Sequence, residues 1–440
     1  MARKILILSC KTLKKEKSEP MSKLQKKVIQ SAIKKAGKKS DSPLFGQIIK
    51  LIPRHLLIKC VDIYQSDKHC SAYKTYDQLV SLLFGQLNKC LSLREITMGL
   101  GLTPETITDL GLAQSPAKST MSDGNAKRDY RVFELLYKEL IKHYRTVYAK
   151  TSDYKVIDEI KGKNIKIIDS TTMSVSLNLF NWAKFRTAKG GIKAHVSLDE
   201  AMMLPELVHI TEAGVSDRRG VDNFRYEVDT IVVDDRGYFD FKLFMQRIAD
   251  KNHFVTRIKD NTLYQSVIEK ELTDTNSDAI IKDEIILFTG LAAQKAGLSG
   301  IKLRRTAVYI EKDDRTVVLI TNQLDWSADT IAELYKRRWN IETFFKLIKQ
   351  NLQIKTFVGT HPNSCKSQLF VGLIAYFLLE LIRRAISKVR HRFGHFATLI
   401  RICLMHYTGL DYVVNEIKDV VKKARESKSP PQTMQKMMFT

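Results

Sequence analysis

The sequence lacks the features that would place the chain in a membrane, in an oxidising compartment or around a structural zinc ion. Its six cysteines include no C-x-x-C pair and no regular spacing from histidine, which argues against a zinc site and favours reduced thiols. The longest apolar run, LFVGLIAYFLL at residues 369–379, is too short to cross a bilayer and predicts a buried helix. The first residues lack a long apolar region followed by a small-residue cleavage site. We therefore expect a cytoplasmic protein.

Acidic residues are also scarce relative to basic ones. The chain has 72 Lys and Arg against 48 Asp and Glu, a net charge of +24, which favours a polyanionic partner such as nucleic acid or an acidic membrane surface. The absence of a membrane-length apolar run weakens the membrane alternative. With 440 residues, 44% of them hydrophobic and 9% aromatic, the chain can form two or three globular domains, so disorder does not dominate it.

The positive charge is concentrated at the N-terminus. Residues 1–40 contain 13 Lys and Arg against 2 Glu, so this segment carries +11 and the other 400 residues share +13. We expect a mobile or partly helical basic arm. Charge alone suggests that it tethers the protein nonspecifically to DNA. Met21 lies within this arm and is an alternative start of translation.

Residues 41–150 have the apolar periodicity of helices and predict a helical DNA-binding domain. A short helix in SLREITMGLGL, a Gly-containing connection and the polar segment SPAKSTMSDGNAKR resemble a helix-turn-helix whose last segment reads DNA. Ser115 is placed to cap that last helix, with Pro116 in its first turn. The alternative is a helical bundle without groove contact; the overall charge favours DNA contact.

The rest of the chain predicts an α/β domain. Residues 160–259 alternate strands such as KIIDS and TIVVDD with the helix FDFKLFMQRIAD. Residues 260–325 contain strand runs without long helices between them and predict a β-rich insertion. Residues 326–386 predict helices that close the core, and residues 387–440 predict a helical C-terminal region and tail. Within the last region, residues 412–424 form an amphipathic pattern that fits a subunit interface or packing on the same domain.

Four polar residues share one face of a predicted helix in ELYKRRWNIETFFKLIKQNL, residues 333–352. Tyr335, Arg338, Glu342 and Lys349 are three, four and seven positions apart, so at helical periodicity they fall within an arc of roughly 60°. The arc borders the apolar stripe, so we expect these side chains at the edge of a packed core. Glu342 paired with a nearby lysine on the exposed face of the helix is the alternative reading, and Tyr335 can simply lie at the core margin.

Two further carboxylates follow predicted strands. Asp169 is expected at the end of KIIDS, and Asp235 at the end of TIVVDD. Acidic residues are unfavourable within strands, so carboxylates at strand ends indicate a role outside the core, although Asp169 can also begin a turn. If Glu342 packs against the same sheet edge, three carboxylates converge, and carboxylate oxygens are the ligands that Mg²⁺ prefers. Two Mg²⁺ ions about 4 Å apart can activate an attacking oxygen and stabilise a leaving oxygen of a phosphodiester.

These residues together resemble a known signature. The spacing Y-x2-R-x3-E-x6-K, with IIDST around Asp169, VVDDRGYFD around Asp235 and WAKFRTAKGGIKAHV between them, is similar to bacterial insertion-sequence DDE transposases of the IS-four (YREK) family. The resemblance extends over residues 45–386, because LFGQIIKLIPRHLL and SPAKSTMSDGNAKR resemble the N-terminal helical DNA-binding domain of one branch.

The resemblance implies a fold and an activity. The fold is a ribonuclease-H-like catalytic core interrupted by a β-rich insertion. Asp169, Asp235 and Glu342 are implied as ligands of two Mg²⁺ ions, for which Mn²⁺ can substitute, and Tyr335, Arg338 and Lys349 as residues that hold DNA. In this family the DNA is nicked, the freed 3′ hydroxyl forms a hairpin at the transposon end, and the reopened end is joined to target DNA within a homodimeric synaptic complex. The implied location is the bacterial cytoplasm, at the nucleoid.

The sequence leaves alternatives for the roles of several residues and for the function. Asp235 is preferred because it precedes Arg236 and Gly237, as in the family, and Asp234 is the alternative. Asp199 and Asp217 are interpreted as solvated or helper carboxylates. Lys193 and His195 are interpreted as a surface lysine and a packed histidine. A DNA-binding repressor derived from an inactive transposase and a structure-selective nuclease with the same core are the competing functions.

Overall fold

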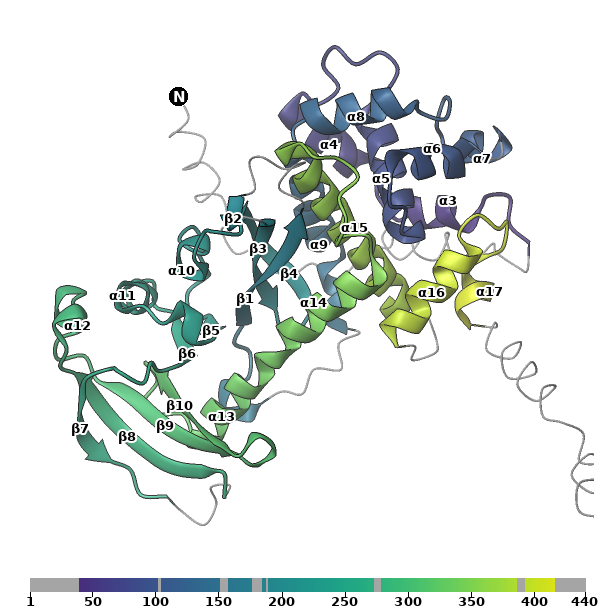
Figure 1. Cartoon of the computed structure of the whole chain (residues 1–440). Helices are drawn as coiled ribbons and strands as arrows, with labels where there is room; N and C mark the ends of the chain where they lie inside the picture. Colours follow the sequence, from purple (N-terminus) through teal and green to yellow (C-terminus); the bar gives the residue numbers. More distant parts are fainter. Residues whose placement is uncertain are drawn as a thin grey trace, which may run out of the picture.

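The computed structural model describes residues 39–101, 104–150, 157–175, 184–186, 189–272, 278–385 and 392–415. A helical part, a twisted sheet and a β-rich end follow one another across the molecule, with two helices in line along the sheet (Figure 1). Nearly all of the predicted basic arm lies outside the described residues. So does residue 416 onward, which includes most of the predicted C-terminal amphipathic helix.

The first part is helical, as its periodicity predicts. Apolar side chains recur on one face of each longer helix; in α5 they include Leu79, Leu83 and Leu87, all buried. The helices in chain order are α3 (Leu44–Ile49), α4 (Arg54–Tyr64), α5 (Thr75–Asn88), α6 (Leu93–Gly101), α7 (Pro104–Asp109), α8 (Lys118–Lys127) and α9 (Arg131–Lys150).

The predicted cap of α8 is wrong. The helix begins at Lys118, after an Ala117 that gives no side-chain cap, so Pro116 precedes the helix instead of lying in its first turn. The hydroxyl of Ser115 donates to the carbonyl oxygen of Thr97 in α6 at 3.1 Å and is therefore committed to anchoring the preceding loop. The other end of α8 is fixed by the buried Arg128, which donates to α5 and to the loop before it.

A ten-stranded sheet forms the centre of the molecule. Its strands in spatial order run β2-β3-β1-β5-β6-β10-β9-β8-β7, and β4 pairs with β3. The long strands β1, β3 and β4 are antiparallel neighbours, whereas β5 is parallel to both β1 and β6. Their bounds are β1 (Ile165–Val175), β2 (Lys184–Arg186), β3 (Lys189–Asp199), β4 (Leu204–Glu212), β5 (Ile231–Val233) and β6 (His253–Arg257), with α10 (Asp217–Gly220) and α11 (Phe241–Ala249) between them.

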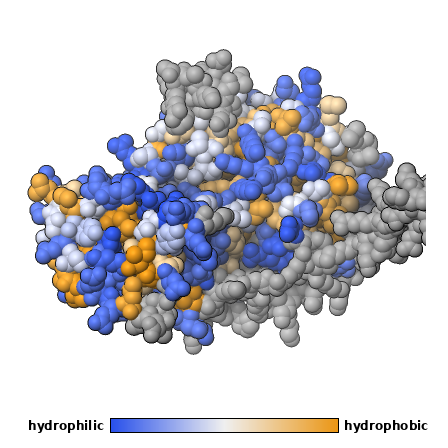
Figure 2. Space-filling view, turned by 60° about the horizontal axis from the view of Figure 1, so that its bottom comes forward, coloured by the Kyte–Doolittle hydropathy of each residue, from blue (hydrophilic) through white to orange (hydrophobic). Residues whose placement is uncertain are grey.

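The β-rich segment continues this sheet. Its last strand, β10 (Arg315–Thr321), pairs antiparallel with β6, and the other strands follow outward. Several large hydrophobic side chains are exposed on these strands, and orange side chains lie at this end of the molecule (Figure 2). The remaining elements are β7 (Tyr264–Glu269), β8 (Ile280–Phe288), α12 (Leu291–Lys295) and β9 (Leu303–Ile310). The sequence predicted these strands but not their union with the core sheet.

The helix predicted around residues 333–352 is divided in two. Its parts are α13 (Ala328–Arg337) and α14 (Trp339–Asn351), and they meet at Arg338. There the amide of Arg338 donates to the carbonyl of Tyr335, and the amide of Ile341 donates to that of Arg338. These bonds span three residues instead of four, which tightens one turn, while Arg338 keeps helical φ and ψ. The two helices therefore stay in line (Figure 1).

The long apolar helix α15 (Pro362–Ala385) lies inside the protein. By length and composition it is long enough to cross a membrane, but 94% of its most apolar window is buried. It packs against α5 and α9 of the helical part and against β4, and α16 (Phe393–Cys403) and α17 (Leu410–Asn415) complete this layer. The prediction of a buried helix is confirmed, and one hydrophobic core extends from the N-terminal helices to one face of the sheet.

Candidate active site

Asp169 lies within β1, not at its end as predicted. The strand continues to Val175 because β3 pairs with it along its whole length. The parallel partner β5, however, pairs with β1 only as far as Ile167. Asp169 therefore lies where the sheet opens between the two strands, and alternation places its side chain on the same face as Ile167, the face covered by α14.

The neighbouring carboxylates Asp234 and Asp235 lie on opposite faces of the sheet. Asp235 has the same parity as Val233 in the main core and opens the short turn Arg236–Tyr238, where it accepts a hydrogen bond from the Gly237 amide at 2.8 Å. Asp234 is fully buried and pairs with the buried Arg247 at 2.5 Å. Asp234 is thus committed to a structural ion pair, whereas Asp235 faces the same side as Asp169.

Glu342 is in the first turn of α14 and is bound by Arg338. Its Oε1 lies 2.7 Å from Arg338 Nη1. The alternative pairing of Glu342 with a following lysine is not what the structure contains. The Arg338 guanidinium also lies 5.7 Å from the Tyr335 ring centroid and 5.2 Å from that of Trp339, which is 50% exposed. The position of Trp339 at this site was not anticipated from the sequence, since its spacing does not distinguish it from a core residue.

The electrostatics of Asp169 show that the three carboxylates share one neighbourhood. Burial raises the pKa of Asp169 to about 7, and the negative charges of Asp235 and Glu342 contribute to the rise. The Ser170 amide, which donates to Asp169 at 2.7 Å, and the Arg338 guanidinium lower this pKa in part. Asp169 is therefore close to half protonated at neutral pH, as expected for a carboxyl group held near two others in a partly buried site.

The last two residues of the predicted set, Tyr335 and Lys349, lie on the same pair of helices. Burial raises the pKa of the Tyr335 phenol, and the charges of Arg338 and Asp235 also act on it. Lys349, two turns beyond Glu342 on α14, donates from Nζ to the carbonyl oxygen of Thr172 in β1 at 3.1 Å. Burial lowers the pKa of this ammonium group. Five of the six predicted site residues thus act on one another's charge, and Lys349 lies further along α14, bound to β1.

The carboxylate oxygens of this site suit a hard divalent cation, provided that Glu342 changes its partner. Asp169 and Asp235 offer carboxylate oxygens. Burial and the neighbouring negative charges disfavour ionisation of Asp169, and a bound cation would favour the ionised form. Across the part of the chain that the structure describes, no three His, Cys, Asp or Glu side chains are already arranged to hold one metal ion. Glu342 is held by Arg338, so it would have to exchange this partner to become a ligand.

A further polar group borders the site, because a Cβ on Gly237 would meet the carboxylates of both Asp235 and Asp217. Ser170 donates to Asp217 at 2.6 Å, and Lys193 Nζ lies 3.2 Å from the same carboxylate. Lys193 is thus partly buried and bound instead of being a surface residue, whereas His195 is packed as predicted, and burial lowers its pKa to about 4. The prediction for Asp199 is wrong, because it is buried and pairs with Lys166 at 2.6 Å.

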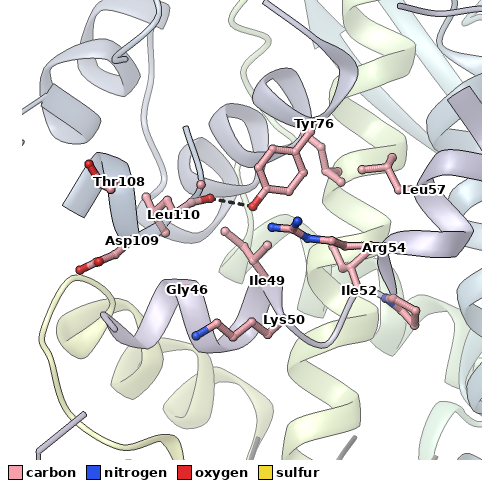
Figure 3. A pocket seen from close by; sticks show the side chains of 13 residues that line it. Gly46, Ile49, Lys50, Ile52, Arg54, Leu57, Tyr76, Thr108, Asp109 and Leu110 are labelled. Atoms are coloured by element: carbon pink, nitrogen blue, oxygen red, sulfur yellow. Dashed lines mark hydrogen bonds between the residues drawn. The ribbon is translucent and has the colours of Figure 1, made fainter. Parts of the chain in front are cut away.

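A cavity of about 360 Å³ lies among the N-terminal helices, away from the carboxylates. The guanidinium of Arg54 and the phenol of Tyr76 point toward one another across it (Figure 3), and the phenol donates to the carbonyl oxygen of Leu110 at 2.6 Å. None of the six predicted site residues lines this cavity. Its lining comprises Gly46, Ile49, Lys50, Ile52, Pro53, Arg54, Leu57, Tyr76, Leu79, Thr108, Asp109, Leu110 and Gly111.

The part of the chain that contains the carboxylates matches a known protein family. Residues 160–378 match the family described as "Transposase DDE domain", and all six predicted site residues fall within this range. Residues 40–113, in the helical part, match a domain of unknown function, DUF4372.

Two bacterial proteins resemble the chain over most of their length. One, from Geobacillus stearothermophilus, is named as a transposase for insertion sequence element IS5377; it is 30% identical over 57% of this chain and 65% of its own length. The other, from Sinorhizobium fredii, is named as a transposase, y4zB; it is 31% identical over 66% of this chain and 78% of its own length.

Among solved structures, a piggyBac transposase synaptic complex with hairpin DNA aligns with 89% of this chain and 82% of that one. Its TM-score of 0.39 and identity of 11% are too low to support an argument about fold. This chain belongs to the DDE transposases of insertion sequences.

Proposed function

We propose that this protein is a cut-and-paste DNA transposase of the IS-four (YREK) group, which binds the terminal inverted repeats of its element, cleaves them through hairpin intermediates and joins the ends to target DNA. The observation that carries the proposal is the meeting of Asp169, Asp235 and Glu342 beside Tyr335 and Arg338, with Lys349 two turns beyond Glu342 on the same helix. The strand arrangement agrees with a ribonuclease-H-like core, because three antiparallel strands are followed by two that run parallel to the first.

The three carboxylates would hold two divalent cations, Mg²⁺ or Mn²⁺. When bound, such ions activate the attacking oxygen and stabilise the leaving oxygen of the phosphodiester. The chain's own contribution is to position the carboxylates on rigid elements. Asp169 is fixed by β1 and Asp235 by its bond to the Gly237 amide, so little movement is needed at two of the three ligands.

Arg338 would couple DNA binding to assembly of the site. In the free protein its guanidinium is bound to Glu342. A phosphate group can accept two parallel hydrogen bonds from a guanidinium and thus compete with this carboxylate. Transfer of Arg338 to the DNA backbone would release Glu342 toward Asp169 and Asp235. Tyr335 would support the guanidinium through its ring, and Lys349 would add a further positive charge.

A second candidate is a DNA-binding repressor derived from a transposase, without catalysis. The complete set of carboxylates at one place argues against loss of catalysis. The proposed transposase acts in the cytoplasm on double-stranded DNA as a homodimer in the synaptic complex. A nuclease with the same core would release 3′ ends without joining them to DNA, so strand joining distinguishes it from a transposase.

Cleavage of labelled DNA that carries the element's own end tests the proposal. Wild type with Mg²⁺ is expected to give nicked, hairpin and joined products. Asp169→Ala, Asp235→Ala and Glu342→Ala are expected to bind the same DNA without cutting it. Binding by wild type without any cleavage, in Mg²⁺ or Mn²⁺, would favour the repressor instead.

A further inference from the structure

Four cationic side chains follow one another from the carboxylate site to the junction of the N-terminal and C-terminal helices. They are Lys349 near the end of α14, Lys355 in the loop after it, Lys89 at the end of α5 and Arg401 in α16. Only Lys349 belongs to the predicted site. We call the other three, Lys355, Lys89 and Arg401, the cationic track.

Direct contacts hold the track together. Lys89 Nζ donates to the carbonyl oxygen of Gln350 at 2.5 Å, in the last turn of α14 and next to Lys349. Both α5 and α14 pack against α16, which places Arg401 on the same junction. The end of α14 lies beside α16 in Figure 1. The track therefore connects three helices that are distant in sequence.

The track carries positive charge without compensation. Among the residues that the structure describes, none of the three forms an ion pair with a carboxylate. Burial lowers the pKa of Lys89, and Arg401 and Lys355 lower it further, while Lys355 also lowers that of Lys349. Glu95, on nearby α6, is engaged with the backbone amide of Leu91 and the hydroxyl of Ser92.

Like charges gathered in this way repel one another, and a bound polyanion removes the repulsion. The substrate supplies such a polyanion, because a duplex whose scissile phosphate lies at the carboxylates must leave the site over neighbouring surface. The track begins next to Lys349, and its three cations, none of them paired with a carboxylate among the described residues, continue away from the site. An extended phosphate backbone fits this row better than a single small anion does.

We propose that the cationic track binds the phosphate backbone of DNA as it leaves the carboxylate site, so that α5 and α16 form one continuous DNA-binding surface with α14. This inference rests on the proposed function and adds to it a DNA path. Phosphate contacts carry no base information, so the track should strengthen binding to any duplex equally.

The test is the salt dependence of DNA binding by the full-length protein. A triple variant combines Lys89→Asn, Lys355→Gln and Arg401→Gln; asparagine is chosen because Lys89 has φ 58°, which asparagine tolerates. The matched control, Lys242→Gln with Lys295→Gln and Lys302→Gln, removes the same charge from exposed lysines of α11 and the β-rich end. Each protein is titrated with a labelled duplex carrying the element end and with a scrambled duplex of equal length, over a range of salt concentrations.

Each lost phosphate contact lowers the slope of log K against log salt concentration by about 0.9, so the track variant should lose roughly 2 to 3 from the slope on both duplexes. The control should keep the wild-type slope. If the triple variant is poorly folded, Lys355→Gln alone, in an exposed loop, should lose about one.

If the folded track variant still binds and cuts DNA and its salt slope is unchanged, the proposed track is wrong. The proposed function then still stands. An equal loss in the control overturns the track also, because the effect would then come from net charge. Failure of the wild type to bind DNA at all would instead overturn the proposed function on which the track rests.

Discussion

The two adjacent carboxylates Asp234 and Asp235 illustrate how one position in a strand decides a residue's role. Side chains alternate across a sheet, so neighbours face different environments. Asp234 meets Arg247 in the interior, whereas Asp235 meets the site with Asp169. From the sequence, both residues are expected at the same strand end. Asp235 was preferred as the site residue only because it directly precedes Arg236 and Gly237.

This difference predicts opposite phenotypes. Asp234→Ala leaves the Arg247 charge buried and unpaired, so it should lower the free energy of unfolding by about 3 to 5 kcal/mol. Asp235→Ala removes a carboxylate from the site face and should leave the unfolding free energy close to that of wild type while abolishing cleavage. Urea unfolding and DNA cleavage of the two variants provide the comparison. A severe loss of stability in Asp235→Ala, or normal cleavage by it, would contradict the assignment.

The raised pKa of Asp169 predicts a pH dependence of stability. The folded protein keeps the Asp169 proton up to a pH of about 7, whereas the unfolded chain releases it near the ordinary carboxyl pKa of about 4. The folded state therefore binds more protons between these values, and this group lowers stability as the pH rises from about 4 to 7. At pH 8 without metal, Asp169→Asn should be more stable than wild type, by up to about 4 kcal/mol for a shift of about three pKa units.

Thermal unfolding at pH 5 and pH 8 checks this expectation, with Asp123→Asn as a control at an exposed carboxylate. The gain from Asp169→Asn should be larger at pH 8. Added Mg²⁺ should raise the Tm of wild type at pH 8 and have less effect on Asp169→Asn. Equal responses of the two proteins to pH and to Mg²⁺ would show that the pKa of Asp169 is not raised and that Asp169 does not bind the metal ion.

The helix α8 exposes the residues that the proposed DNA-reading role requires. Met121 and Asn125 face the interior, whereas Lys118, Ser119 and Ser122 are exposed. Substituting these three exposed residues by alanine should weaken binding to the element's end more than binding to scrambled DNA. The expected loss is about 1 to 3 kcal/mol for each base contact removed.

A competition experiment between the two DNAs measures this preference, and Lys68→Ala provides a control for charge in the same helical part. An equal loss on both DNAs would indicate phosphate contacts only. No loss on either would support the helical bundle without groove contact.

Periodicity predicted the elements well, but not their junctions. The apolar spacing of 331–352 indicated a helix, and the tightened turn at Arg338 depends on backbone bonds that no spacing encodes. Likewise, the strand run of β10 was recognisable, whereas its pairing with β6 is a contact between segments about 60 residues apart. The error at Ser115 has the same origin, because its hydroxyl is used by Thr97 on another helix.

The N-terminal helices and the sheet share one hydrophobic core. Tyr137 of α9 donates to the carbonyl oxygen of Pro205 in β4 at 2.8 Å, and α15 packs against α5 and α9. A fragment of residues 40–150 would expose the surfaces that α15 and β4 cover. Although the sequence suggested a separate domain here, we expect this fragment to lack cooperative unfolding in urea, monitored by circular dichroism. A fragment that unfolds cooperatively at the midpoint of the full chain would contradict this expectation.

If the three carboxylates hold the metal ions that serve DNA cleavage, replacing one of them with a different kind of ligand should change which ion supports cleavage. A thiolate is a poor ligand for Mg²⁺ but is better accepted by Mn²⁺, which is the softer ion. We predict that Asp235→Cys cleaves the element's end in Mn²⁺ but not in Mg²⁺, whereas Asp250→Cys, at an exposed carboxylate that ends α11, shows no such difference. Equal activity of Asp235→Cys in both ions, or equal inactivity while DNA binding is intact, would contradict direct metal binding at this position.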